Sequence, residues 1–381
     1  MNMACNIILV TLDGMRSDRL NLSPSLMKVK DDSLFFQNMI TVSPYTIASL
    51  HAIFSGMYAK DNGVDAYYKM SKFKENEIKT IGEIFQENEY FTACDILHDA
   101  VIPKKGFNER NVFDEDTVNF KKRHSELIKS MAKKKKFFLF LHYTEPHKNL
   151  VKEILNKDKN KQKDSNENNV SDDEFFSSMD ENKKRYDSYM PELDEYVKKI
   201  MDTVKKSGLE KNTIIVFHAD HGTSLGEKLG EKFYGVFVYD YTAKVFAIIK
   251  IPNQGAKIIK QQCQTIDLFP TILELAKIES DKRLNIQGKS LFELVNSDKK
   301  DDRIAFVETG GLYGPWPSPT KHNVFCVRYN NKKLIYNETP NTWEFYNLEN
   351  DPEEKDNIFD ENSKLINEYK EKLINHFDKL A

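Results

Sequence analysis

The sequence has few cysteines, no long apolar segment and little net charge. Its four cysteines, Cys5, Cys94, Cys263 and Cys326, lie far apart in the chain of 381 residues and form no Cys-x-x-Cys pair. This spacing argues against a disulfide framework or a zinc knuckle and favours free thiols in a reducing compartment. No segment approaches the ~20 uninterrupted apolar residues of a membrane-spanning helix, and the N-terminal residues lack the basic start of a signal peptide. We therefore expect a cytoplasmic protein without stable membrane insertion.

The charges of the chain are nearly balanced. There are 56 Lys and Arg residues against 59 Asp and Glu residues, which gives a formal net charge of −3. This balance provides no global attraction to nucleic acid or to an anionic membrane, so we expect no nucleic-acid partner and only local anion sites. The apolar fraction of 40% fits a globular protein with a sizeable core. Nothing in these quantities predicts an oligomeric state.

Three apolar runs of the sequence each end in acidic residues or histidines. The runs span residues 6–13, 137–147 and 213–222, and each is typical of a buried parallel strand. Helical patterns alternate with the strands, for example at residues 80–89 and 189–208. The alternation predicts an α/β fold with a mostly parallel, doubly wound sheet. The polar strand ends mark the edge at which such sheets bind ligands.

The composition divides the chain into a long α/β region and a short tail. Residues 1–297 are predicted to form the α/β domain, and residues 152–185, poor in apolar residues and rich in both charges, form an insertion that either faces water or covers the cleft as a lid. Residues 298–381 are predicted to form a small C-terminal subdomain. Its alternating pattern turns at Asn330 and Asn331 as a hairpin does, and helical spacing follows near the C-terminus.

Two strand ends provide candidate metal ligands. Asp13 closes the first run, and Asp220 and His221 close the third, where Gly222 leaves backbone room for a ligand. Two carboxylates and an imidazole suit Mn²⁺ or Zn²⁺ best, with Mg²⁺ or Ca²⁺ as alternatives. Taken alone, Asp13 is equally compatible with a helix N-cap.

The mostly apolar segment 43–56 offers the hydroxyls of Ser43, Thr46 and Ser49 as candidates for chemistry. An unassisted hydroxyl is a poor nucleophile at neutral pH, and a neighbouring metal ion is one means of activating it. Thr46 could equally cap the helix predicted to follow it, and Ser43 stands before a proline as a turn residue does.

Five blocks of the sequence resemble the sulfatase branch of the alkaline phosphatase superfamily, and they occur in the family's order. They are NIILVTLDGMRSDRL (6–20), SPYTIASLHAIFSGMY (43–58), FLFLHYTEPH (138–147), NTIIVFHADHGTSLGE (212–227) and WEFYNLENDPEEKDNI (343–358). The resemblance implies an alkaline-phosphatase-like fold with a small C-terminal antiparallel sheet and helix.

The resemblance implies that Thr46 is the nucleophile. In sulfatases this position opens a Cys-x-Pro-Ser-Arg block; here Thr46 takes the place of the Cys and Ser49 that of the Ser, while Ala48 and Leu50 replace the Pro and Arg. Sulfatases convert Cys or Ser at this position to formylglycine, and threonine is not a substrate for that conversion. Threonine instead resembles the phosphoester branches of the superfamily, including phosphotransferases that form a phosphothreonine.

The resemblance also implies a ligand set of Asp13, Thr46, Asp220 and His221. Sulfatases usually have a second Asp directly after the first, whereas this chain has Gly14 there. The departure predicts a sparser shell and one divalent metal ion rather than a sulfatase-type calcium site.

Further substrate contacts are implied by the resemblance. His147 matches the histidine that contacts the ester group or protonates its leaving oxygen, and His142 is a less certain neighbour. Lys232 is the candidate cation for the transferred group, with Lys228 as the alternate, although either lysine could simply be solvated. Arg16 could reach the anion or pair with the neighbouring aspartate.

The combined prediction is a metal-dependent hydrolase or phosphotransferase that uses Thr46 on a phosphate mono- or diester. The substrate is expected to be a small molecule or a glycan-linked ester. Two alternatives stay open: hydrolysis of a sulfuric ester without formylglycine, and a non-catalytic relative that only binds its ligand.

Overall fold

The computed structural model describes residues 5–64, 72–152, 172–279, 284–296, 303–309, 323–377 and 380. Nine strands of these residues form one large sheet in the order β4-β3-β5-β1-β6-β7-β2-β8, with β9 beside β2. The strands are β1 (Asn6–Leu12), β2 (Leu34–Ile40), β3 (Phe91–Ile96), β4 (Glu109–Val112), β5 (Phe137–Tyr143), β6 (Thr213–His218), β7 (Lys244–Lys250), β8 (Lys257–Ile259) and β9 (Cys263–Gln264). All are parallel to their neighbours except β7, which pairs antiparallel with both β6 and β2.

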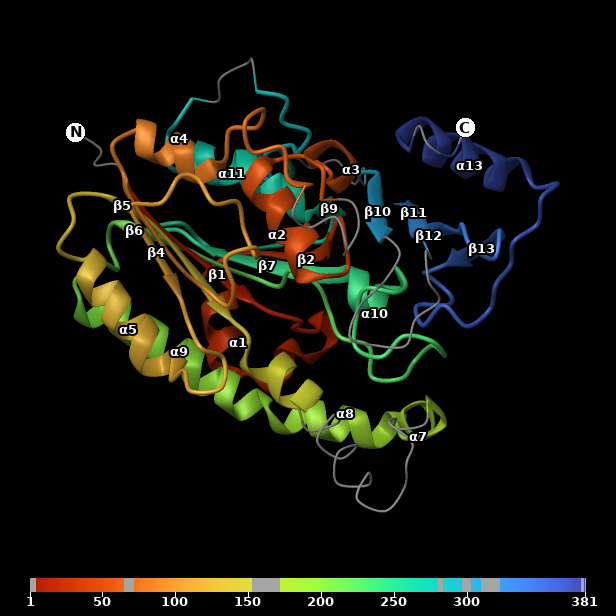
Figure 1. Ribbon diagram of the computed structural model, residues 1–381, viewed down its shortest axis with the longest axis horizontal. Coiled ribbons are helices and arrows are strands. Elements are labelled where there is room, and N and C mark those ends of the chain that lie inside the picture. The colour runs from red at the N-terminus through yellow and green to blue at the C-terminus, as the bar shows by residue number, and fades with distance from the viewer. Residues whose placement is uncertain are drawn as a thin grey trace.

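Helices cover both faces of this sheet, as Figure 1 shows. One face carries α1 (Pro24–Lys30), α5 (Phe120–Met131) and α9 (Met190–Lys206), and the other carries α2 (Thr46–Ser55), α4 (Ile81–Glu87) and α11 (Leu268–Leu275). Other helices before the C-terminal sheet are η1 (Ser17–Leu22), α3 (Ala59–Asn62), α7 (Asp172–Ser177), α8 (Met179–Ser188), α10 (Asp240–Ala243), η3 (Thr265–Asp267) and α12 (Phe292–Val295). The predicted doubly wound α/β fold is confirmed.

The central strands are buried because helices lie on both sides of them. Every residue of β1 and of β5 is buried, which explains why these strands read as continuous apolar runs rather than as alternating ones. β1 pairs with β5 on one side and with β6 on the other. Since the three strands are parallel, their carboxyl ends meet at one edge of the sheet.

A second, antiparallel sheet follows near the C-terminus. It contains β10 (Ala305–Thr309), β11 (Val324–Tyr329), β12 (Lys332–Asn337) and β13 (Thr342–Asn347), and α13 (Lys364–His376) packs against it. Asn330 and Asn331 have φ angles of 48° and 56°, the left-handed conformation that a tight two-residue hairpin requires. The predicted hairpin, small sheet and closing helix are confirmed.

Two contacts tie this second sheet to the large one. Arg328 and Lys333 reach Asp240 of α10 at 3.1 and 2.9 Å. At the edge strand β10, the Glu308 N–H donates to the carbonyl of Val42 at 3.0 Å, four residues before Thr46. The C-terminal sheet therefore supports the segment that leads into α2.

Some predictions fall partly outside the described residues. Of the predicted insertion 152–185, residues 153–171 lie outside them, while the remainder includes α7 and the larger part of α8. The predicted domain boundary between residues 297 and 298 also lies outside the described residues. All four cysteines are free, and three of them are buried. Among the described residues, no helix combines the length and the apolar character needed to cross a membrane.

Candidate active site

The carboxyl ends of β1 and β6 bring three potential metal ligands together. Asp13 directly follows β1, and Asp220 and His221 follow β6, so the parallel pairing of the two strands makes these side chains neighbours. One ligand atom from each residue lies within 4.8 Å of the others, and all three side chains are buried.

Two carboxylate oxygens of this cluster are placed to bind a cation. Asp13 Oδ1 and Asp220 Oδ2 are buried and have no hydrogen-bond partner among the described residues. Burial and the neighbouring charge of Asp13 raise the pKa of Asp220 to about 6. For Asp13, burial acts in the same direction, but a hydrogen bond from His142 and three nearby imidazoles outweigh it, and the pKa lies below its usual value. Two buried carboxylates with free lone pairs are donors that divalent ions prefer.

A second contact orients the imidazole of His221. Its Nδ1 lies 2.7 Å from the carbonyl oxygen of Gly222, which can only accept, so Nδ1 carries the proton. Nε2 therefore presents a lone pair to the cluster, 3.6 Å from Asp13 Oδ1 and from Asp220 Oδ2. Carbonyl contacts of this kind commonly fix the tautomer of metal-binding histidines.

Thr46 is the first residue of α2, and its hydroxyl faces the cluster. Its Oγ1 lies 3.1 Å from His221 Nε2 and 3.4 Å from Asp13 Oδ2. The preceding Tyr45 is extended (φ −153°), so the chain enters the helix at Thr46, where free N–H groups and the helix dipole favour an anion. The other two hydroxyls make structural contacts, because Ser43 donates to the carbonyl of Glu308 and Ser49 to that of Asp220.

The backbone conformation and the space at residue 14 favour glycine over a second aspartate after Asp13. Its φ is +63°, and a Cβ at this position would lie 2.8 Å from His147 Nδ1 and from Thr223 Oγ1. Both distances are too short for real Cβ contacts, so a side chain at residue 14 would displace His147. The lack of a second aspartate thus goes together with close packing of His147 against the backbone of Gly14.

The two predicted histidines lie on either side of this cluster. His142, on β5, is fully buried and its Nε2 lies 2.8 Å from Asp13 Oδ2, which favours a role in orienting Asp13 over the predicted contact with substrate. His147 follows β5 in the helical segment 145–152, and its ring centroid lies 5.7 Å from that of His221. Burial lowers the pKa of His147 to about 4.

The loop after His221 carries the two predicted lysines. Lys228 donates to the carbonyl of Glu354, and its ammonium lies 4.5 Å from the ring centre of Tyr239, which favours a structural role over the predicted substrate contact. Lys232 is partly buried between Glu231 and Phe233, and its role stays a prediction.

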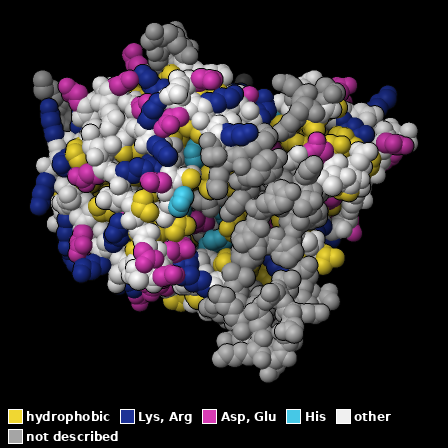
Figure 2. All heavy atoms as spheres, viewed as in Figure 1, with side chains coloured by type: hydrophobic (Ala, Val, Ile, Leu, Met, Phe, Trp, Pro, Cys, Tyr) yellow, Lys and Arg dark blue, Asp and Glu magenta, His cyan; other side chains and the backbone are white. Residues whose placement is uncertain are grey.

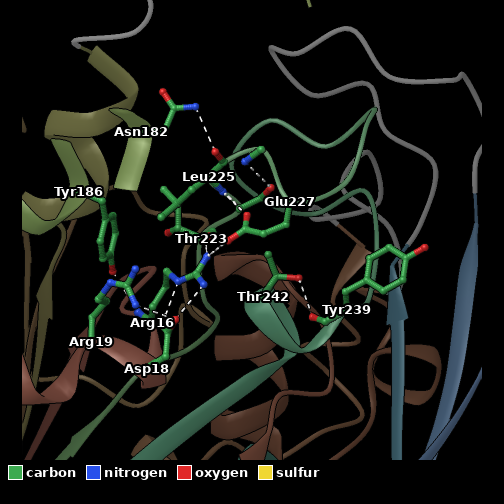
Figure 3. A network of polar contacts seen from close by, with 12 residues as sticks. Arg16, Asp18, Arg19, Asn182, Tyr186, Thr223, Leu225, Glu227, Tyr239 and Thr242 are labelled. Atoms are coloured by element: carbon green, nitrogen blue, oxygen red, sulfur yellow. Dashed lines mark hydrogen bonds and ion pairs between the residues drawn. The ribbon is translucent and has the colours of Figure 1, made fainter. Parts of the chain in front are cut away.

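Arg16 holds the first part of this loop, as Figure 3 shows. Its guanidinium donates to both oxygens of Asp18 at 3.0 Å, to Glu227 Oε1 at 2.6 Å and to the carbonyl of Thr223 at 2.9 Å. Thr223 in turn donates to the carbonyl of Gly14 at 2.7 Å. Of the two alternatives for Arg16, the structure therefore favours the pairing with Asp18 over contact with the substrate anion.

The sequence analysis missed Thr223 and Tyr234. Thr223 Oγ1 lies 3.4 Å from His147 Nδ1, and the ring of Tyr234 packs against those of His147 and His221 with centroids 4.7 and 4.9 Å apart. Thr223 could have been proposed as a site residue from the sequence, because it stands two residues after His221. Tyr234 comes into contact only because the loop folds back, which no spacing in the sequence indicates.

Arg16→Ala is expected to lower the free energy of unfolding by about 3 kcal/mol, because it leaves a partly buried carboxylate and a buried carbonyl without their donor. Arg19→Ala is the matched control: Arg19 also pairs with Asp18 at 2.9 Å but is more exposed, and its loss is expected to cost about 1 kcal/mol or less. Urea denaturation measures both. Equal losses for the two variants would contradict this account of Arg16.

Glu231 is expected to make stability depend on pH. Its buried Oε1 accepts the N–H groups of Val236 and Phe237 at 2.9 and 2.8 Å, and burial raises its pKa from 4.5 to about 7. Between these values the folded state binds more protons than the unfolded chain, so the free energy of unfolding falls as pH rises through this window, by about 3 kcal/mol at most. Thermal unfolding of Glu231→Gln and of the wild-type protein from pH 4.5 to 8 measures this, and parallel curves would refute it.

The mostly parallel sheet, the hydroxyl at a helix N-terminus beside a buried Asp and His cluster, and the small C-terminal sheet define an alkaline-phosphatase-like α/β protein. The family model for sulfatases matches residues 5–278, and the chain belongs to the sulfatase family. A second model, described as the C-terminal region of N-sulphoglucosamine sulphohydrolase, matches residues 230–379. The predicted family is thereby confirmed.

Known relatives of the chain are mainly sulfatases. The N-acetylglucosamine-6-O-sulfatase of Bacteroides thetaiotaomicron is 29% identical over 189 residues, or 46% of this chain and 33% of that protein. With two further sulfatases, the match spans 26% and 35% of the relative's length. The structure of a 2-O GAG sulfatase has a TM-score of 0.77 at 17% identity and covers 99% of this chain and 92% of the other. The phosphonate monoester hydrolase of Agrobacterium radiobacter has a TM-score of 0.73 at 14% identity, with 99% and 94% covered.

Proposed function

We propose that this chain is a metal-dependent hydrolase or transferase that acts on a phosphate mono- or diester through Thr46. The observation that carries the proposal is the hydroxyl of Thr46, 3.1 Å from His221 Nε2 and 3.4 Å from Asp13 Oδ2 at the start of α2. A nucleophilic hydroxyl needs a group that accepts its proton or stabilises its anion, and this position offers both.

The unpartnered oxygens of Asp13 and Asp220, together with His221 Nε2 and the Thr46 hydroxyl, are the groups that would hold one divalent ion, with Mn²⁺ or Zn²⁺ favoured. When bound, such an ion supplies positive charge that stabilises the Thr46 oxygen and the non-bridging oxygens of the ester.

Each candidate residue has its own role in the proposed reaction. Thr46 Oγ1 gives up its proton to water and forms a bond to phosphorus as the bond to the leaving group breaks, and the departing oxygen takes a proton from water to leave as the alcohol. His147 hydrogen-bonds the departing oxygen, and Lys232 balances charge on the non-bridging oxygens. Water or an acceptor alcohol then displaces Thr46 and takes the group. The free N–H groups at the start of α2 favour the negative charge that develops at Thr46.

Threonine at residue 46 is the reason for preferring a phosphoester. Sulfatases that use formylglycine derive it from Cys or Ser, which this chain lacks at that position. The likeness to a phosphonate monoester hydrolase supports phosphorus chemistry on this fold. The names of the relatives favour a second candidate, hydrolysis of a sulfuric ester by Thr46 without formylglycine. They also support a glycan-linked or small-molecule ester as the substrate class.

A comparison of three chromogenic esters tests the proposal. Metal-stripped protein is resupplied with Mn²⁺, Zn²⁺, Mg²⁺ or Ca²⁺ and assayed with nitrophenyl phosphate, bis(nitrophenyl) phosphate and nitrophenyl sulfate. We expect metal-dependent release from a phosphate ester. Release from the sulfate alone would replace the proposal by its second candidate. Absence of turnover with every ester and metal would leave only a binding function or a dedicated transferase.

A further inference from the structure

A cleft of about 1090 Å³ lies between the large sheet, α8 and the C-terminal sheet. Its walls come from η1, β2, α8, the start of β7 and the segments around β11 and residue 353. The lining contains none of the candidate catalytic or metal-binding residues, namely Asp13, Thr46, His147, Asp220 and His221. The cleft is therefore separate from the candidate active site, although Arg16 and Glu227 of Figure 3 belong to its wall.

Basic side chains outnumber acidic ones in this cleft, although the chain as a whole is slightly acidic. Eight Lys and Arg residues and five Asp and Glu residues line it. Every one of the five carboxylates already makes an ion pair: Asp18 and Glu227 with Arg16, Asp240 with Arg328 and Lys333, Glu353 with Lys355, and Glu354 with Lys333. The acidic side chains are thus neutralised within the fold.

Four lining lysines make no ion pair with a described residue; Lys228 donates to the carbonyl of Glu354, which leaves three. Lys183 belongs to α8, Lys244 begins β7 and Lys260 follows β8, so they approach the cleft from three separate elements. None of them makes an ion pair with the residues that the structure describes. Like charges brought together in one concave site repel each other unless a counter-ion enters, so their convergence favours an anionic ligand.

Arg328 adds a guanidinium to the wall of the cleft. The side chain of Arg328 is only 4% exposed, and its other nitrogens contact Asp240, Gln262 and Asn38. Its Nε, however, has no partner within the described part of the chain. Since this nitrogen is itself buried, Arg328 favours an anion in the cleft through its positive charge and not through a hydrogen bond from Nε.

We propose that this cleft is a second binding site, which takes a small molecule bearing several phosphate or sulfate groups. Lys183, Lys244 and Lys260 would provide the positive charge that holds these groups. The volume is that of sites for drug-sized ligands. The proposal does not depend on the function proposed for Thr46, because the two sites share no ligand-binding side chain.

Isothermal titration of the metal-free full chain tests the site. Tripolyphosphate and sucrose octasulfate serve as the probes, one for each source of oxyanion. We expect one molar equivalent of at least one probe to bind, with an affinity that falls as salt is added. The double variant Lys244→Ala/Lys260→Ala is expected to bind at least about tenfold more weakly, which corresponds to ~1.4 kcal/mol.

The control variant Lys129→Ala/Lys198→Ala removes the same charge from two exposed helical positions outside the cleft. It is expected to bind within about twofold of the wild-type protein. Equal weakening in the two double variants would mean nonspecific attraction and would overturn the proposal, as would the absence of binding by both probes. Circular dichroism of each variant verifies folding. Ester hydrolysis is assayed separately, so that failure of one site is not mistaken for failure of the other.

Discussion

Thr46→Ala is expected to abolish turnover of the best phosphate ester, with kcat lower by at least about 10³-fold, while the fold stays intact and the three remaining ligands keep most of the metal. The reason is local: within the described residues, the substitution removes the one hydroxyl that contacts both Asp13 and His221, whereas Ser43 and Ser49 donate to backbone carbonyls. Steady-state kinetics with Mn²⁺ or Zn²⁺, together with elemental analysis of the purified protein, measure both quantities.

Thr46→Ser is the matched control, because it keeps the oxygen and removes only the methyl group. We expect it to retain measurable phosphoester turnover. A Thr46→Ala protein with wild-type rates on every active ester would refute the nucleophile assignment. A Thr46→Ala protein that loses metal as well would show that the hydroxyl contributes to metal binding, and the kinetic result would then need to be repeated at saturating metal.

Asp220→Asn is expected to weaken divalent-ion binding by about 100-fold or more, and at the same time to stabilise the metal-free protein. Both effects follow from the buried carboxylates of Asp13 and Asp220, whose facing oxygens have no partner and whose charges repel each other when no ion lies between them. Thermal unfolding with and without added Mn²⁺ or Zn²⁺ measures both, since an ion that binds only the folded state raises the melting temperature.

The wild-type protein is expected to gain stability on metal addition, and Asp220→Asn to gain little. The control is Asp267→Asn, a substitution of another buried aspartate, which pairs with Arg303 at 3.0 Å and lies outside the cluster. It should lose stability but keep the metal-induced gain. An unchanged metal response in Asp220→Asn would remove Asp220 from the ligand set.

Much of the fold could be predicted because the decisive signals are local. The apolar runs at residues 6–13 and 213–222 are continuous since helices cover both faces of β1 and β6, and each run ends where the carboxyl edge begins. Asn330 and Asn331 predicted the hairpin because its two-residue turn needs positive φ, which few residues other than glycine and asparagine adopt readily. Parallel pairing of β1 with β6 then brings Asp13 close to Asp220 without any further information.

The remaining parts of the site depend on contacts across long stretches of sequence. The guanidinium of Arg16 contacts Glu227, 211 residues later, and this pairing, which spacing in the sequence does not show, favours a structural role for the arginine over contact with substrate. The same holds for Lys228, whose ammonium bonds to the carbonyl of Glu354. His142 stands near the end of an apolar run in the sequence, but only the folded structure shows that its Nε2 lies 2.8 Å from Asp13 Oδ2.

The bond between Glu308 and Val42 has a consequence for how the protein is made. Thr46 lies near the beginning of the chain, yet the segment that leads into it is held by a strand that the ribosome adds roughly 260 residues later. Since chains emerge N-terminus first and domains tend to fold as they emerge, the segment around Thr46 leaves the ribosome before its support exists. That support is complete only after β10 has been synthesised, so a truncated translation product that ends before residue 305 carries every predicted ligand but not the strand that holds the segment leading into Thr46.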